Sequence, residues 1–337
     1  MIHPWNRALF QQLTSDRERM PHALLLHGPA GVGKRDLGLA LAQWALCEAP
    51  TEDGACGVCD ACNWFLQGNH PDYRYLEPKE EETDETGKVI KKASKEIKVE
   101  QVREVTDFLY LSAHRGGWRT ALVYPAEFMN GAAANALLKT LEEPPPRVLL
   151  LLVSHQPGRL LPTVRSRCRK IAVGLPEPEL ALEWMQQAGV TDAESVLAEA
   201  GGAPLAAIGF ADVERGERRD AFLEYLSKPA QLDVCAVAEA YKPLLSEAWG
   251  WLVRWVHDAL SQRLSGASRY FPARAEVVAR LATQADLAGL IALERELAAA
   301  GRWLRHPLNA TMLLESWLIR YVAAVSGPVS GISFAQS

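Results

Sequence analysis

Gly28 to Lys34 have the residue types and spacing of a loop that binds phosphate. They read Gly-Pro-Ala-Gly-Val-Gly-Lys. In a glycine-rich loop with this spacing, backbone N–H groups turn toward the phosphates and the lysine reaches the outer phosphate oxygens. The candidate cofactor-binding residues are therefore Gly28, Gly31, Gly33 and Lys34.

The residue after this loop is Arg35, at the position where a Ser or Thr hydroxyl normally holds Mg²⁺. Phosphoryl transfer in sites of this kind depends on the metal ion to offset the charge that develops on the phosphate. The sequence therefore predicts a phosphate cradle without a magnesium site, which does not hydrolyse ATP. It leaves open whether phosphate or nucleotide binds there without turnover.

A second position that should handle the metal is also altered. An ATPase of this type needs an acidic pair at the end of a neighbouring strand, to support Mg²⁺ and to orient the attacking water. Here the strand-like run 119–124 is followed by Pro125 and Ala126. Glu127 comes one residue late, and we interpret it as a surface carboxylate. The rival hypothesis is an active ATPase with atypical Mg²⁺ ligation, through Glu127.

Four cysteines have the spacing C-x8-C-x2-C-x2-C: Cys47, Cys56, Cys59 and Cys62. Four thiolates fill the tetrahedral shell of Zn²⁺ and leave no open position, which predicts a structural zinc site. The alternatives are unrelated buried thiols and a redox CxxC pair, although this CxxC does not lie in a thioredoxin-like βαβ unit. A DNA-contacting zinc element is a further hypothesis. Residues 55–66 include Trp64 and Phe65 for stacking, but no Lys or Arg to meet phosphates.

A basic run extends from Thr163 to Lys170 and contains Arg165, Arg167 and Arg169. An arginine at the edge of a domain can enter the nucleotide site of a neighbouring subunit and neutralise charge in the transition state. Taken alone, however, a run of this kind is more often a solvated basic patch.

The elements that must position these residues alternate between strands and helices. Short apolar runs predict core strands at 23–27, 119–124, 148–153 and 170–173. Helical periodicity follows the glycine loop and returns at 99–112 and 130–142. This order predicts a phosphate-loop α/β domain, a parallel sheet with flanking helices, over residues 1–174. The charged segment 77–98 is expected to be a solvated loop or exposed hairpin.

Beyond Pro176 the chain contains no strand-like run. Three short helices are predicted at 179–189, 192–200 and 204–213, and longer ones at 241–264, 273–283, 286–300 and 307–325. We therefore expect a small helical domain over 175–214, a larger all-α domain over 215–326 and a disordered tail at 327–337.

The composition is that of a globular protein, with 48% hydrophobic and 23% charged residues over 337 positions. A net charge of −5 argues against a surface that clamps nucleic acid over its whole extent. The first ten residues lack the apolar core of a signal peptide, and the longest aliphatic run is too short to span a bilayer. We expect a cytoplasmic protein with no membrane contact.

Two segments closely resemble motifs of the bacterial clamp-loader ATPases. The first is Asn135 to Pro145, which reads Asn-Ala-Leu-Leu-Lys-Thr-Leu-Glu-Glu-Pro-Pro, and the second is Ser166-Arg167-Cys168. The four-cysteine insertion is also similar to that family, and residues 306–316 look like its last collar helix. The resemblance spans nearly the whole chain. It implies an AAA+ module, a three-helix lid and a helical collar that holds five subunits in a ring.

Within that family, a degraded nucleotide site beside a retained Ser-Arg-Cys motif is expected of a member that does not hydrolyse ATP. The resemblance implies that Arg167 is an arginine finger offered in trans to the adjacent ATPase subunit, and that the four cysteines hold zinc. It also implies partners: the gamma/tau ATPase subunits and a delta subunit of a hetero-pentameric ring in DNA polymerase III. The sliding clamp and primer-template DNA are then reached through the complex during DNA replication.

Overall fold

The computed structural model describes residues 2–79, 82–83, 89–91, 96–114, 117–301, 304 and 309–326. The chain divides into two compact units, Met1–Leu180 and Ala181–Ser337. The finer division at residues 174 and 214 stays a prediction. The predicted tail, 327–337, lies outside the described residues.

The first unit is built on a five-stranded sheet with the order β2-β5-β6-β1-β7. Its strands are β1 (Ala23–His27), β2 (Tyr73–Leu76), β5 (Arg119–Val123), β6 (Val148–Ser154) and β7 (Arg169–Ala172). Every neighbouring pair in this sheet is parallel. The predicted parallel α/β domain is therefore confirmed, with β2 as an edge strand that the sequence analysis missed.

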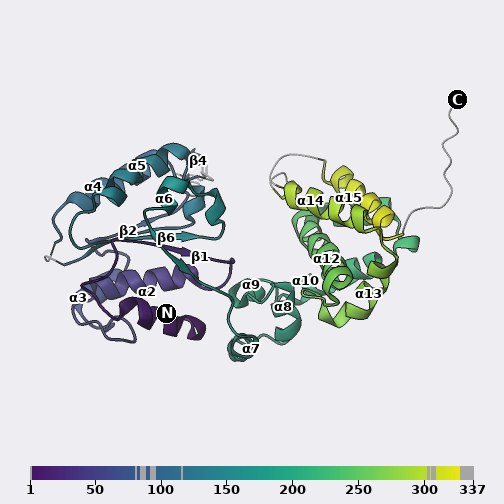
Figure 1. The fold of residues 1–337 in the computed structure, drawn as a ribbon, viewed down its shortest axis with the longest axis horizontal. Helices are drawn as coiled ribbons and strands as arrows, with labels where there is room; N and C mark the ends of the chain where they lie inside the picture. The colour runs from purple at the N-terminus through teal and green to yellow at the C-terminus, as the bar shows by residue number, and fades with distance from the viewer. Residues whose placement is uncertain are drawn as a thin grey trace. The chain divides into compact units, whose positions relative to one another are not determined.

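Helices cover both faces of this sheet (Figure 1). On one face lies α2 (Lys34–Leu46), with α3 (Asp60–Leu66) on the same side. A Cβ atom added to Gly38 in α2 would lie 2.7 Å from Cδ1 of Leu122, so the glycine lets this helix approach β5 closely. On the other face lie α4 (Val99–Tyr110) and α5 (Gly131–Glu142). Both faces are covered, which explains why every residue of β6 is buried.

The remaining elements of this unit are short: η1 (Pro4–Asn6), α1 (Arg7–Thr14), η2 (Ala126–Phe128), η3 (Pro157–Arg159) and α6 (Pro162–Arg165). In the charged segment, β3 (Glu82–Thr83) and β4 (Val89–Lys91) pair antiparallel, as expected of a hairpin. Other parts of that segment lie outside the described residues.

The second unit is helical. It contains most of α7 (Pro178–Gln187), then α8 (Ala193–Glu199), α9 (Pro204–Ile208), α10 (Val213–Ser227), η4 (Pro229–Gln231), α11 (Val234–Tyr241), η5 (Lys242–Leu244), α12 (Leu245–Ser265), η6 (Pro272–Arg274), α13 (Ala275–Gln284), α14 (Leu287–Ala300) and α15 (Ala310–Val325). The helix predicted from Tyr241 instead begins at Leu245. Pro243 lies in η5, and a proline there cannot donate the backbone hydrogen bond that a continuous α-helix needs.

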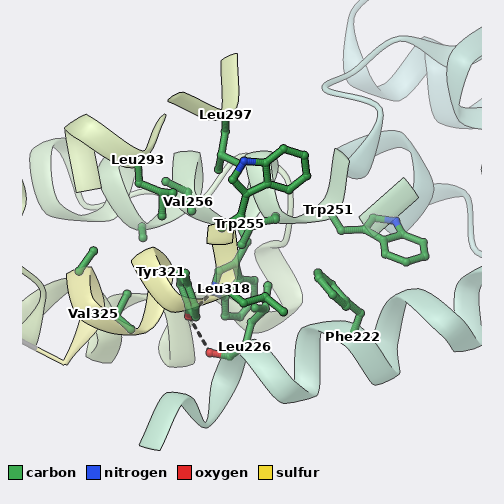
Figure 2. Close-up of a cluster of buried hydrophobic side chains, with 14 of the residues drawn as sticks. Phe222, Leu226, Trp251, Trp255, Val256, Leu293, Leu297, Leu318, Tyr321 and Val325 are labelled. Carbon is green, nitrogen blue, oxygen red and sulfur yellow. Dashed lines mark hydrogen bonds between the residues drawn. The ribbon is translucent and has the colours of Figure 1, made fainter. Parts of the chain in front are cut away.

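An aromatic core holds α10, α12 and α15 together (Figure 2). Trp255 in α12 donates from Nε1 to the hydroxyl of Tyr321 at 2.8 Å, and that hydroxyl donates to the carbonyl of Leu226 at 2.6 Å. Both aromatic side chains are fully buried, and burial raises the pKa of Tyr321. Because each polar atom has a partner, the hydrogen bonds offset the cost of removing these polar groups from water.

A buried carboxylate joins α8 to α10 and α12. Glu199 has no exposed surface, and Arg215 and Arg219 donate to its oxygens at 2.6 and 2.9 Å. Trp251 donates to the same carboxylate from Nε1 at 3.2 Å. Burial alone would raise the pKa of Glu199, but the two arginines outweigh it and hold that pKa below its usual value.

Within the described ranges, no helix combines the length and apolar character that crossing a bilayer requires.

Candidate functional site

The glycine loop follows β1 directly and enters α2. Gly28 has φ of +150°, and a Cβ atom there would lie 2.1 Å from the carbonyl oxygen of Val173. Gly31 and Gly33 have φ of +78° and +81°, in the left-handed region. These backbone conformations favour glycine, and the predicted strand, loop and helix are present. That the loop binds phosphate stays a prediction.

Lys34 is folded back onto its own loop. Its ammonium group donates to the carbonyl of Gly28 at 2.8 Å and also to the carbonyl of Pro29. The side chain is only 2% exposed, and burial lowers the pKa of Lys34 to about 8, against the opposing effect of Glu127. The ammonium group of Lys34 therefore donates its hydrogen bonds to carbonyls of its own loop.

Arg35, at the position where a Ser or Thr is usual, lies against two aromatic rings at the end of the sheet. Its guanidinium carbon lies 5.3 Å from the ring centre of Tyr75 and 5.5 Å from that of Tyr124. Tyr124 directly follows β5, the strand whose end should carry the acidic pair. The guanidinium of Arg35 thus places a positive charge between two aromatic faces at this end of the sheet.

The interpretation of Glu127 as a surface carboxylate is wrong. Glu127 lies in η2 and is only 8% exposed. Its Oε1 accepts a hydrogen bond from the backbone N–H of His155 at 3.0 Å, and its Oε2 has no hydrogen-bond partner among the described residues. The short 3-10 turn after Pro125 points the carboxylate inward, toward the end of β6, which the sequence alone did not indicate.

His155 completes this cluster at the carboxyl edge of the sheet. Its Nε2 lies 3.3 Å from the Tyr124 hydroxyl, and the rings meet edge to face. Burial lowers the pKa of His155, and the nearby charge of Lys34 lowers it further. A neutral imidazole is therefore favoured beside Lys34, against the opposing effect of the Glu127 carboxylate on the pKa of His155.

The amino-terminal turn packs against the glycine loop. Trp5 and Asn6 both donate side-chain N–H groups to the carbonyl of Val32 at 3.0 Å. The His3 ring lies against Gly33 and bonds Asp36 at 2.9 Å. The sequence analysis missed this contact. The only sign of it is the polar and aromatic residues of the amino-terminal turn, which lie far from the loop along the chain.

The structure brings the four predicted cysteines together. Their sulfur atoms all lie within 4.8 Å of one another. The Sγ atoms of Cys47 and Cys59 are 3.9 Å apart, and those of Cys56 and Cys62 are 4.0 Å apart. In a tetrahedral site with Zn–S bonds of about 2.3 Å, neighbouring sulfurs are separated by about 3.8 Å. The four sulfurs can therefore hold one metal ion.

Two helix ends set this geometry. Cys47 follows the last turn of α2, and Cys59 is the N-cap of α3, where its sulfur accepts from the backbone N–H of Cys62. The N–H of Cys56 points at the sulfur of Cys47, at 3.2 Å. Backbone N–H groups of Val58 and Cys59 lower the pKa of Cys56 to about 6. The inserted loop is thus folded around its sulfurs, as metal ligation requires.

Arg167 lies between α6 and β7, at the surface of the first unit. Its Nη2 is paired with Oε1 of Glu142 at 2.6 Å, and its Nη1 donates to the carbonyl of Thr163 at 3.0 Å. The next residue, Cys168, is buried in the core beside Val164. Burial of Cys168 directs its neighbour outward. The pairing with Glu142 was not predicted, although Glu142 belongs to the segment that carried the family resemblance.

Comparisons with known proteins match DNA polymerase III subunits over most of the chain. The family model described as "DNA polymerase III, delta subunit" matches residues 5–176, and its C-terminal counterpart matches residues 214–322. The DNA polymerase III subunit delta' of Pseudomonas aeruginosa is 37% identical over 97% of this chain and 99% of the relative. The subunit delta' of Escherichia coli is 32% identical over 86% of this chain and 81% of the relative.

A subunit tau of Escherichia coli is 34% identical, over 44% of this chain and 21% of the relative. Among solved structures, a DNA polymerase III gamma subunit-related protein of Thermotoga maritima covers 95% of this chain and 99% of its own, with a TM-score of 0.46 and 17% identity.

Proposed function

The chain belongs to the delta-prime subunits of the DNA polymerase III clamp-loader family, and from this premise we propose that it acts in the ring without hydrolysing ATP itself. The observation that carries this proposal is the placement of Arg35. Its guanidinium lies against Tyr124, where a metal-dependent site needs its acidic pair. Pro125 and Ala126 follow in place of those acids. Both positions that should bind Mg²⁺ are altered, so ATP hydrolysis here would lack the metal ion that offsets the charge on the phosphate.

The purified chain should release no phosphate from ATP in the presence of Mg²⁺. The physical reason is the cation at Arg35 together with the missing acidic pair, which leave the developing charge on the phosphate uncompensated. Steady-state phosphate release by the chain alone measures this directly. Lys34→Ala is the matched variant, because it removes the group that would reach the phosphates. Release by the wild type that this variant abolishes would establish an active site and reject the proposal.

The rival function is an ATPase with unusual metal ligation, and one observation favours it. Oε2 of Glu127 is buried and has no hydrogen-bond partner among the described residues. Burial lowers the pKa of Lys34, and the carboxylate is close enough to oppose that effect. A carboxylate in this state is a hard oxygen ligand of the kind that Mg²⁺ takes. Against it, the other oxygen of Glu127 is used by the backbone of His155. The assay above distinguishes the two functions.

Arg167 is proposed as the arginine finger of this subunit. It would enter the nucleotide site of an adjacent ATPase subunit and neutralise charge that develops in the transition state. Its place at the surface, beside the buried Cys168, supports this role because the guanidinium can reach a neighbour while its backbone stays fixed. The proposed partners are the gamma/tau ATPase subunits and a delta subunit in a hetero-pentameric ring. The sliding clamp and primer-template DNA would be met through that ring, in the cytoplasm.

We further propose that the four-cysteine cluster holds a structural Zn²⁺, and that the chain consists of an AAA+ module (1–174), a lid (175–214) and a collar (215–326). The sulfur separations and the closed set of four thiolates support zinc without an open position for chemistry. Zinc bound there would tie the inserted loop to the end of α2. It would add stability and take no part in turnover.

The chain should contain one equivalent of zinc, and Cys59→Ser should lose it. Replacing one thiolate of four leaves an incomplete tetrahedral shell, and metal binding in such sites is coupled to the folding of the loop. Metal analysis of the purified variants measures the content. Cys235→Ser is the control, since Cys235 is exposed on α11 and should keep full zinc. Equal zinc in the two variants, or none in the wild type, would contradict this assignment.

A further inference from the structure

We propose that Glu142 is a positioning residue for Arg167, holding its guanidinium in the orientation needed by the neighbouring nucleotide site. This inference rests on the proposed finger role of Arg167. It adds a residue on another element, α5, that determines how well the finger works. The interaction concerned is the ion pair between Nη2 of Arg167 and Oε1 of Glu142, at 2.6 Å.

The guanidinium has three acceptors, one on Nη2 and two on Nη1. Besides the carboxylate of Glu142, the carbonyl of Thr163 and the hydroxyl of Ser166 accept from Nη1 at 3.0 and 3.4 Å. The Ser166 hydroxyl is itself oriented, because it donates to the carbonyl of Thr163 at 3.1 Å. Each terminal nitrogen of a guanidinium carries two N–H groups. With one N–H of Nη2 directed at Glu142, its second N–H can still donate to a phosphate oxygen.

Glu142 is suited to this task because the end of its helix is fixed. It is the last residue of α5, and Pro144 forces the chain out of the helical conformation at Glu143. The residue before it, Leu141, is 3% exposed and packs in the core of the first unit. On the other side, the hydroxyl of Tyr110 donates to the carbonyl of Glu143 at 3.2 Å. The backbone that carries the carboxylate is thus anchored before and after it.

The partner residue is anchored as well. Cys168 is 7% exposed in the same core, and the backbone N–H of Arg167 donates to the carbonyl of Val164 at 3.1 Å. Without these acceptors, the long side chain of Arg167 would sample many rotamers in solvent. A catalytic group gains from being held close to its working geometry before the reaction. Glu142 supplies that restraint.

The carboxylate of Glu142 could instead inhibit the finger. A carboxylate paired with a finger can compete with the phosphate for it, so that Glu142 would hold the finger back. Positioning and competition predict opposite signs for the loss of the carboxylate charge. Glu142 and Arg167 keep 50% and 35% of their side chains exposed, so solvent screens the pair and the expected effect is modest in either direction.

The test is ATP turnover by the reconstituted clamp-loader complex that contains Glu142→Gln. Positioning predicts a kcat lower by about two- to fivefold, with an unchanged KM for ATP and unchanged assembly on size-exclusion chromatography. Glu143→Gln is the matched control, because it removes the same charge one residue along and should leave kcat unchanged. An unchanged or higher kcat for Glu142→Gln would overturn the proposal.

A double-mutant cycle separates positioning from a general structural effect. If Glu142 acts through Arg167, Glu142→Gln should have no further effect on kcat in a complex that already carries Arg167→Ala. Equal effects in the two backgrounds would show that Glu142 acts elsewhere and would reject the inference. If Arg167→Ala itself leaves turnover unchanged, the finger role fails. If only Glu142→Gln is silent, the finger role stands and the positioning role fails.

Discussion

Arg167→Ala should lower ATP hydrolysis at the adjacent subunit of the reconstituted ring by about 10² or more, because fingers of this kind contribute 10³–10⁵ in related reactions. The finger acts on charge that develops in the transition state, so turnover should fall while assembly and nucleotide affinity change little. Turnover is measured by single-turnover hydrolysis and by clamp loading by the complex. Assembly is measured by size-exclusion chromatography, and nucleotide affinity by nucleotide binding.

Arg169→Ala is the control for that experiment. Arg169 lies two residues away in β7, is exposed and has the same charge. If the run from Thr163 to Lys170 acts only as a solvated basic patch, both variants should have similar, small effects. A loss confined to Arg167→Ala supports the finger. Equal turnover in both variants and in the wild type would contradict it.

Glu199→Ala should lower the free energy of unfolding of the second unit by about 3–5 kcal/mol, the cost usual for removing one partner of a buried ion pair. The carboxylate has no exposed surface, and its loss leaves the buried guanidinium groups of Arg215 and Arg219 without their counter-ion. For a unit of this size the melting temperature should fall by about 10 °C. Thermal unfolding followed by circular dichroism measures the change.

Glu194→Ala provides the matched control, because Glu194 is an exposed residue of the same helix, α8. Its melting temperature should stay close to that of the wild type. If Glu199→Ala had the same melting temperature as Glu194→Ala, the buried carboxylate would not hold these helices together. The same pair of variants also distinguishes loss of the buried network from a general effect of removing negative charge.

The arginine partners also predict a pH dependence of stability. Because Arg215 and Arg219 hold the pKa of Glu199 below its usual 4.5, this carboxylate stabilises the fold above the pKa of the unfolded state. That contribution is lost as the pH falls through the lower pKa of the folded state. The difference in unfolding free energy between the wild type and Glu199→Gln should therefore be largest near neutral pH and shrink below pH 4.5.

Much of the first unit could be predicted because its strands are continuous apolar runs bounded by clear turn residues. The run at Val148 to Val153 is the clearest case, because a strand covered on both faces is apolar along its length. The edge strand at Tyr73 to Leu76 was missed because it is short and contains the charged residue Arg74. In the structure, the guanidinium of Arg74 lies over the ring of Phe108. Edge strands tolerate such residues, and the pattern of the sequence does not distinguish them from loops.

The site was predictable where backbone spacing decides it. The glycines of the loop and the four cysteines lie as their spacing indicated, because local turns fix both. The inward carboxylate of Glu127, the contacts of Arg35 with Tyr75 and Tyr124, and the amino-terminal turn against Val32 could not be read in the same way. They depend on which strand ends meet, and that follows from the sheet order and not from local sequence.

We propose that this chain does not hydrolyse ATP itself and supplies a guanidinium to the neighbouring ATPase subunit. This proposal is tested most directly by titrating the purified chain into its ATPase partner subunits while phosphate release from ATP is followed. We expect no phosphate release from the chain alone and a saturable increase when it is mixed with its partners. The Arg167→Ala chain should fail to produce that increase. Release from the chain alone, at a rate that the partners do not raise, would contradict it.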